Sequence, residues 1–118
     1  MRYLCLIYED EKAWEKMTQA DMEKGMAEYN AFTDGIKKSG NYVGGEALQP
    51  TATAKAVRVR NGKISATDGP YVETKEQLGG YYLINAKDLN DAVQVASKIP
   101  GAKHGTVEVR PIMEFNQP

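Results

Sequence analysis

The sequence predicts an α+β domain in which one antiparallel sheet carries two helices on a single face. Two helical patterns alternate with extended segments along the chain, and a hairpin signal, Asn61-Gly62, separates the two halves. The element order is therefore strand-helix-strand, hairpin, strand-helix-strand, which is typical of a ferredoxin-like sheet of four strands. At 118 residues the chain is expected to form one domain, spanning residues 1–118, with one modest core.

The first strand is predicted at Tyr3–Tyr8, where all six residues are apolar or aromatic. Such a run indicates a central strand that is covered on both sides. Asn61-Gly62 lies between two β-prone segments and predicts a tight hairpin, because both residues tolerate positive φ. The other extended segments are predicted at residues 42–45, 56–60, 63–67, 78–85 and 106–112.

Helical periodicity predicts a long helix that begins near Thr18 and ends at Ser39-Gly40. Thr18 and Asp21 have the spacing of a capping box. One apolar stripe is expected to face the core: it consists of Met22, Met26, Tyr29, Phe32 and Ile36.

Two shorter helical segments are also predicted. A helical turn around residues 11–17 would bring Trp14 to the core. A second helix is expected from Asp88 through Lys98 and is stopped by Pro100-Gly101. Its inward residues would be Leu89, Ala92, Val93 and Ala96.

The sheet face opposite the helices needs a cover of its own. Strand alternation is expected to direct apolar and charged residues to it together, namely Cys5, Ile7, Tyr81, Leu83, Glu108, Arg110 and Ile112. This mixture is too apolar for a free surface. We therefore expect a homodimer in which two sheets meet back to back and enclose a cleft.

Composition limits the classes of function. Fifteen basic and sixteen acidic residues give a net charge of −1, which argues against binding to nucleic acid or to an anionic membrane. The single cysteine, Cys5, excludes an intrachain disulfide and fits a reducing cytoplasm. The N-terminal apolar run is too short for a signal peptide or a membrane span.

The segment from Asp68 to Tyr82 is the densest in ionisable groups and glycine. Asp68-Gly69-Pro70 is typical turn chemistry, and Asp68 is also a candidate general base or ligand anchor at the edge of a cleft. Glu73 is a second candidate for the same role. The following Lys75 and Glu76 are more typical of a solvated segment.

His104 is the only histidine, so it is the one side chain whose ordinary pKa suits proton transfer near neutrality. A lone histidine is more often a loop or core residue. If folding brings Asp68 or Glu73 to its ring, the resulting carboxylate–imidazole pair would be the best acid–base candidate in the chain. We therefore predict Asp68, His104 and Glu73 as catalytic residues.

Substrate-binding candidates are Tyr71, Tyr82 and Arg110. Tyrosines that line a pocket would favour a planar ligand, whereas core or dimer packing is the alternative. Arg110 would bind an anionic group, or form a structural ion pair with Glu108. No cofactor or metal is predicted, since one histidine and one cysteine cannot build a zinc site.

Three segments resemble the YCII-related superfamily and, within it, the branch named for a DGPF motif. They are residues 2–8, residues 68–82 with Tyr71 in place of the motif's phenylalanine, and residues 104–111. The resemblance implies a ferredoxin-like domain that dimerises into an α/β barrel. YCII proteins proper look as if they use a His–Asp pair, but the matching positions here are Tyr29 and Ile99, so that pair is not carried over.

Two functions remain open. The first is a small cofactor-free enzyme of isomerase, lyase or hydrolase type, acting on a small organic molecule in the dimer cleft. The second is a ligand-binding or regulatory module. Some members of the DGPF branch lie beside, or are fused to, extracytoplasmic-function sigma factors, so the resemblance implies a sigma factor as a possible partner.

Overall fold

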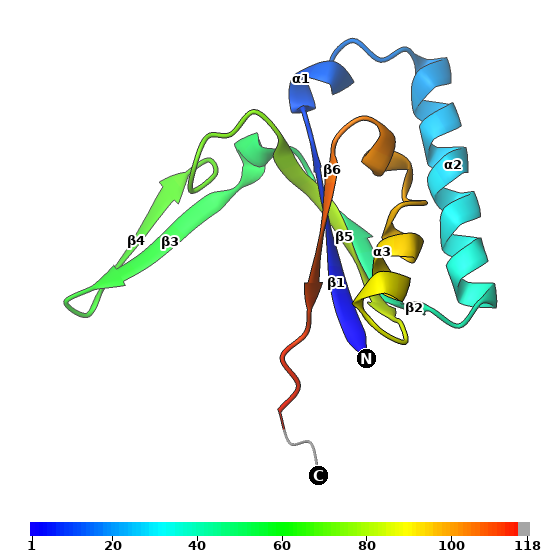
Figure 1. Cartoon of the computed structure of the whole chain (residues 1–118). Helices are drawn as coiled ribbons and strands as arrows, with labels where there is room; N and C mark the ends of the chain where they lie inside the picture. The colour runs from blue at the N-terminus through cyan, green and yellow to red at the C-terminus, as the bar shows by residue number, and fades with distance from the viewer. Residues whose placement is uncertain (116–118) are drawn as a thin grey trace.

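The body of the chain is a four-stranded antiparallel sheet with helices on one side (Figure 1). The computed structural model describes residues 1–115. Its elements are β1 (Arg2–Glu9), α1 (Glu11–Trp14), α2 (Gln19–Lys38), β2 (Tyr42–Ala47), the 3₁₀ turn η1 (Thr51–Thr53), β3 (Lys55–Arg60), β4 (Lys63–Asp68), β5 (Gln77–Asn85), α3 (Leu89–Ala96), the 3₁₀ turn η2 (Pro100–Lys103) and β6 (Thr106–Pro111). The strand order β2-β5-β1-β6 is compatible with a ferredoxin-like fold, so the predicted α+β class is confirmed.

The core lies between the sheet and the two longer helices. Alternate residues of β1 face the helices and are buried: Tyr3, Cys5 and Ile7. They pack in one cluster with residues of β5, α2, α3 and the segment before η2, including Ile84, Phe32, Ile36, Ala92, Ala96 and Ile99. The expectation that Cys5 and Ile7 face away from the helices was therefore wrong, because the other alternating set of β1 occupies that face.

The opposite face of the sheet carries the remaining residues of β1. Leu4 lies opposite Leu83 and Arg110, and Leu6 lies opposite Tyr81 and Glu108. These apolar residues are half-buried in the single chain, and no described helix covers them (Figure 1). We call this surface the open face.

Local signals placed both ends of α2 correctly. Thr18 and Asp21 form the predicted capping box: Thr18 Oγ1 accepts from the Asp21 amide, and the Asp21 carboxylate accepts from the Thr18 amide, both at 3.1 Å. The predicted inward stripe on α2 is only half correct. Phe32 and Ile36 are buried, whereas Met22 and Met26 are 52% and 67% exposed. The first turns of α2 extend beyond the part of the sheet against which α3 packs (Figure 1).

The second helix also differs from its prediction. α3 ends at Ala96, before the expected Lys98. Ala92 and Ala96 are buried as expected, but Leu89 and Val93 are exposed. The residues of α3 that pack on the core are Ala92, Ala96 and the partly buried Val95.

Residues 55–68 form a separate β-hairpin, which we call the arm. β3 pairs with β4, and the predicted Asn61-Gly62 turn is confirmed by φ values of 52° and 74°. The arm extends away from the main sheet, on the side opposite to α2 (Figure 1). It raises the radius of gyration to 16.4 Å, compared with about 13.5 Å for a compact chain of this length.

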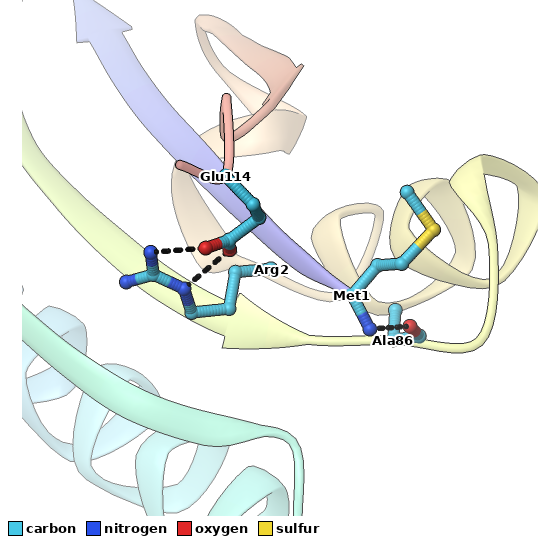
Figure 2. A network of polar contacts seen from close by, with 4 residues as sticks. All are labelled: Met1, Arg2, Ala86 and Glu114. Carbon is cyan, nitrogen blue, oxygen red and sulfur yellow. Dashed lines mark hydrogen bonds and ion pairs between the residues drawn. The ribbon is translucent and has the colours of Figure 1, made fainter. Parts of the chain in front are cut away.

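The N-terminal residues and the segment that follows β6 are each held by polar contacts. The N-terminal amine donates to the Ala86 carbonyl at 3.1 Å, and the Arg2 guanidinium donates to both carboxylate oxygens of Glu114 at 2.7 and 2.9 Å (Figure 2). The bidentate pair holds the segment after β6 against the start of β1. Within residues 1–115, no helix has the length and apolar character to cross a membrane.

Candidate functional site

Glu9, at the end of β1, is held by two side chains from other elements. Its Oε2 accepts a hydrogen bond from Trp14 Nε1 at 3.2 Å, and its Oε1 accepts one from the Tyr29 hydroxyl at 3.3 Å. The Tyr29 oxygen in turn accepts from the Gly101 amide at 3.0 Å. The chain of bonds joins β1, α1, α2 and η2 at one end of the sheet.

A recess of about 280 Å³ opens beside this cluster, between the first half of α2 and η2. Ionisable groups dominate the lining: Glu9, Asp21, Lys24, Glu28, Tyr29 and His104. Met17, Gly25, Pro100 and Gly101 complete it. Acidic, phenolic and imidazole groups therefore share one small volume.

Tyr29 is fixed in its protonated form. Burial raises the pKa of the Tyr29 phenol well above its usual range, and the nearby Glu9 carboxylate raises it further. A neutral phenol donates its hydrogen to Glu9 while its oxygen remains an acceptor for Gly101. In this arrangement the Glu9 carboxylate is oriented by donors on both oxygens.

Gly101 allows this close approach. A Cβ at this position would lie 2.4 Å from Glu9 Oε1 and 2.7 Å from Tyr29 Oη. The residue was predicted only as part of a helix stop, and its contact with the site was missed. Glu9 was not predicted either, although an acidic residue directly after a buried strand indicates a side chain that is held in a fixed position.

The structure brings His104 to the recess but places the predicted carboxylates elsewhere. Asp68 lies at the base of the arm, where Lys55 donates to it, and its side chain is 83% exposed. Glu73 lies in the exposed segment that follows. Among the residues that the structure describes, no hydrogen bond joins His104 to either acid. The carboxylates that share the recess with His104 are Glu9, Asp21 and Glu28. Asp68 is not among them, because it lies in β4 of the arm.

The three predicted substrate-binding residues lie in three different parts of the fold. Tyr71 lies beside the arm, with its ring 5.2 Å from the Arg58 guanidinium, and it is 78% exposed. Arg110 forms the alternative ion pair with Glu108 on the open face.

Tyr82 faces the helices. Its ring contacts Phe32 edge-on at 5.1 Å, and its hydroxyl shares a hydrogen bond of 2.7 Å with Thr33. Burial raises the pKa of Tyr82, and the bond to Thr33 partly opposes this. The side chain therefore packs in the core.

Two further observations concern other chemistry. Thr106 Oγ1 donates to Glu76 at 2.9 Å, so the middle of the Asp68–Tyr82 segment contacts β6 two residues after His104. Within residues 1–115, no three His, Cys, Asp or Glu side chains are grouped in a way that could hold a metal ion.

Comparison with known proteins agrees with the resemblance read from the sequence. The model of the YCII-related domain matches residues 1–116. An uncharacterised protein of Rhizobium meliloti (strain 1021) is 33% identical over 114 residues, which cover 95% of this chain and 92% of the relative.

Proposed function

The chain belongs to the YCII-related family, and we propose that the recess beside Glu9 is an acid–base site for a small organic molecule. The observation that carries the proposal is the Glu9 carboxylate, which two donors orient in the recess that His104 also lines. Groups that can accept, hold and pass on a proton thus lie in one place.

Each group has a distinct role in the proposed reaction. Glu9 accepts a proton from a ligand carbon that a neighbouring carbonyl group makes acidic, and returns it to the same or a neighbouring carbon, which is the chemistry of an isomerase. Tyr29 fixes the carboxylate. His104, which is exposed at the recess, passes protons between the site and water. The cycle consumes no oxidant, reductant or cofactor.

The charges of the lining select the class of ligand. Glu9, Asp21 and Glu28 carry three negative charges there, against one positive charge on Lys24. This field favours neutral or cationic molecules and disfavours carboxylates and phosphates. Arg110, which was predicted to bind an anion, has Glu108 as its partner instead.

The resemblance gives independent support for this location. Tyr29 is the position that matches the histidine of YCII proteins proper, and here it carries the hydroxyl that contacts Glu9. We infer that this chain keeps the site of the family but uses a different carboxylate. We also place the chain in the DGPF branch, on Asp68-Gly69-Pro70, and in the cytoplasm, which suits its single cysteine.

Solvent exchange tests the proposed proton transfer. A panel of small ketones and aminoketones would be incubated with the protein in heavy water, and loss of carbon-bound hydrogen would be followed by proton NMR. We expect Glu9→Gln to slow exchange of an accepted compound by about 10²–10⁴-fold. Glu15→Gln is the matched control, because Glu15 is exposed outside the recess. Equal exchange by Glu9→Gln and the unmodified protein would refute the proposal.

A non-catalytic ligand-binding or regulatory module is the second candidate. The two hydrogen bonds on Glu9 favour it, since a carboxylate with both oxygens engaged can serve as a fixed charge that orients a ligand. This candidate predicts a compound that shifts the imidazole resonances of His104 and is recovered unchanged. Capture of an extracytoplasmic-function sigma factor would support the regulatory form, and a compound that is turned over would exclude it.

We further propose that two copies associate through their open faces as a dimeric α/β barrel. Leu4, Leu6, Tyr81 and Leu83 supply a half-buried apolar surface that a second sheet would cover. Leu83→Glu is expected to give monomers in analytical ultracentrifugation. A monomeric unmodified protein at micromolar concentration would contradict this assembly.

A further inference from the structure

We propose that the recess binds a small uncharged ketone with a branched apolar substituent, and that Gly25 determines this specificity. The substituent occupies the space over Gly25, where α2 has no inward side chain, while the carbonyl end reaches Glu9. The position of the reacting end rests on the proposed function. The space over Gly25 is a separate feature of the helix, so it can be tested without turnover.

Gly25 occupies an inward position of α2. The buried residues Phe32 and Ile36 mark the side of the helix that faces the core. Tyr29 lies three residues before Phe32, and Gly25 lies four residues before Tyr29, so both share this side. Gly25 is half-buried and lines the recess, whereas the neighbouring Met26 is 67% exposed. The turn of α2 next to Tyr29 therefore faces the recess with a residue that has no side chain.

The space over Gly25 is open to a compact apolar group. A Cβ added at this position would have no heavy atom within 4 Å. The recess of about 280 Å³ also has Met17 and Pro100 in its lining. Methionine adapts its shape to an incoming group, and burial of apolar surface between such residues favours binding. A branched alkyl group of the ligand would take the place of the absent side chain.

Glycine weakens the helix at this position. In a helix interior it is less favourable than alanine or leucine, because it loses more conformational freedom on folding. A leucine at residue 25 would also bury its side chain in the recess. The chain lacks both contributions at Gly25. Such a loss of stability is expected where a ligand needs the volume that a side chain would fill.

The spacing along α2 sets the shape of the ligand. Residues four apart on a helix are neighbours, with about 5–6 Å between their Cβ positions. Tyr29 contacts Glu9, so a ligand carbon at Glu9 has only a few carbon atoms between it and the space over Gly25. In a ketone, Glu9 removes a proton from the carbon beside the carbonyl. The electron pair of that C–H bond forms the enolate, and the proton then returns to the carbon.

Titration with methyl isobutyl ketone tests the subsite without turnover, because its isobutyl group equals a leucine side chain. We expect a saturable shift of the Gly101 amide resonance in nitrogen-15 NMR, and no saturation over the same range with acetone. Gly25→Leu supplies the isobutyl group from the helix and should weaken ketone binding at least tenfold. Gly25→Ala should weaken it less. Gly35→Leu is the matched control, because Gly35 is exposed on the same helix outside the recess.

Thermal unfolding measures the open space itself. Gly35→Leu should raise the midpoint by about 3 °C from helix propensity alone. Gly25→Leu should raise it about twice as much, since its side chain is also buried in the recess. Equal shifts in the two variants would show that an added side chain at residue 25 remains in water, and would overturn the proposal.

Hydrogen exchange of the same ketone in heavy water separates this inference from the acid–base function. Exchange that is equally fast in Gly25→Leu and the unmodified protein would refute the subsite and leave the acid–base function standing. Saturable binding that Gly25→Leu abolishes, without exchange in the unmodified protein, would refute only the acid–base function. No saturable binding of methyl isobutyl ketone to the unmodified protein would overturn the inference.

Discussion

The Tyr29 hydroxyl donates to the Glu9 carboxylate across 3.3 Å and connects the end of the central strand to the middle of the long helix. The same oxygen accepts the Gly101 amide. One phenol therefore orients the acid of the proposed site and satisfies a backbone donor of η2. Because burial raises the pKa of Tyr29, the hydroxyl keeps its hydrogen over the physiological pH range.

Tyr29→Phe should destabilise the protein. The substitution leaves the Gly101 amide without its acceptor, and an unsatisfied buried donor costs about 1–3 kcal/mol. Urea denaturation followed by circular dichroism measures the change in the free energy of unfolding. Tyr81→Phe is the control, because the Tyr81 hydroxyl makes no hydrogen bond to residues 1–115. An equal effect of the two substitutions would contradict the role given to Tyr29.

Gly101→Ala and Gly35→Ala should act in opposite directions. The new methyl group at residue 101 would overlap Glu9 Oε1 and Tyr29 Oη, and we expect a cost of about 1–3 kcal/mol from overpacking. At Gly35, on α2, nothing lies within 4 Å of an added Cβ. There alanine should stabilise the helix by about 0.5–1 kcal/mol.

The two glycine variants can be compared by thermal and urea denaturation. Gly101→Ala should also separate Glu9 from Tyr29, which the carboxyl resonance of Glu9 would report. A Gly101→Ala protein as stable as the unmodified chain would show that η2 moves freely, and would remove the reason given for glycine at this position.

Cys5 should resist alkylation in the folded protein. Burial raises the pKa of its thiol to about 11, so almost no thiolate exists at about pH 8. The raised pKa stabilises the folded state fully at pH values below the ordinary thiol pKa. This stabilisation is lost as the pH rises towards about 11. Iodoacetamide followed by mass spectrometry should modify Cys5 only in guanidinium chloride. Met22→Cys, exposed on α2, should react once under native conditions, and equal reactivity of Cys5 would contradict its burial.

Local signals predicted much of the fold. The Thr18–Asp21 box and the Asn61-Gly62 turn were placed correctly, because each depends on residues that are close in sequence. The inward stripe of α2 failed at Met22 and Met26, since periodicity shows which residues share a side but not what covers them. The alternation of side chains along β1 likewise divided its residues between two faces. It did not show that Cys5 lies on the face towards the helices.

The candidate site was harder to predict because it is assembled from distant segments. Glu9, Tyr29 and Gly101 come from β1, α2 and η2. Taken alone, each residue has an ordinary structural explanation. Glu9 is a charge at the end of a strand, Tyr29 is an aromatic residue in an apolar stripe, and Gly101 is a glycine after a helix. His104 was found because it is the only imidazole. The residues that surround His104 are determined by tertiary packing, which no single segment of the sequence predicts.

The Arg2–Glu114 pair makes a final prediction about acid. The hydrogen bond and charge of Arg2 lower the pKa of the Glu114 carboxyl. A lowered folded-state pKa means that the stabilising contribution is present above the unfolded pKa and disappears as the pH falls through the folded value. The segment after β6 should therefore detach from β1 in acid. Carbon-13 NMR of the carboxyl groups should show Glu114 titrating below its usual range, and Arg2→Gln should return it to that range. An unchanged titration in Arg2→Gln would show that the contact in Figure 2 does not hold the segment in solution.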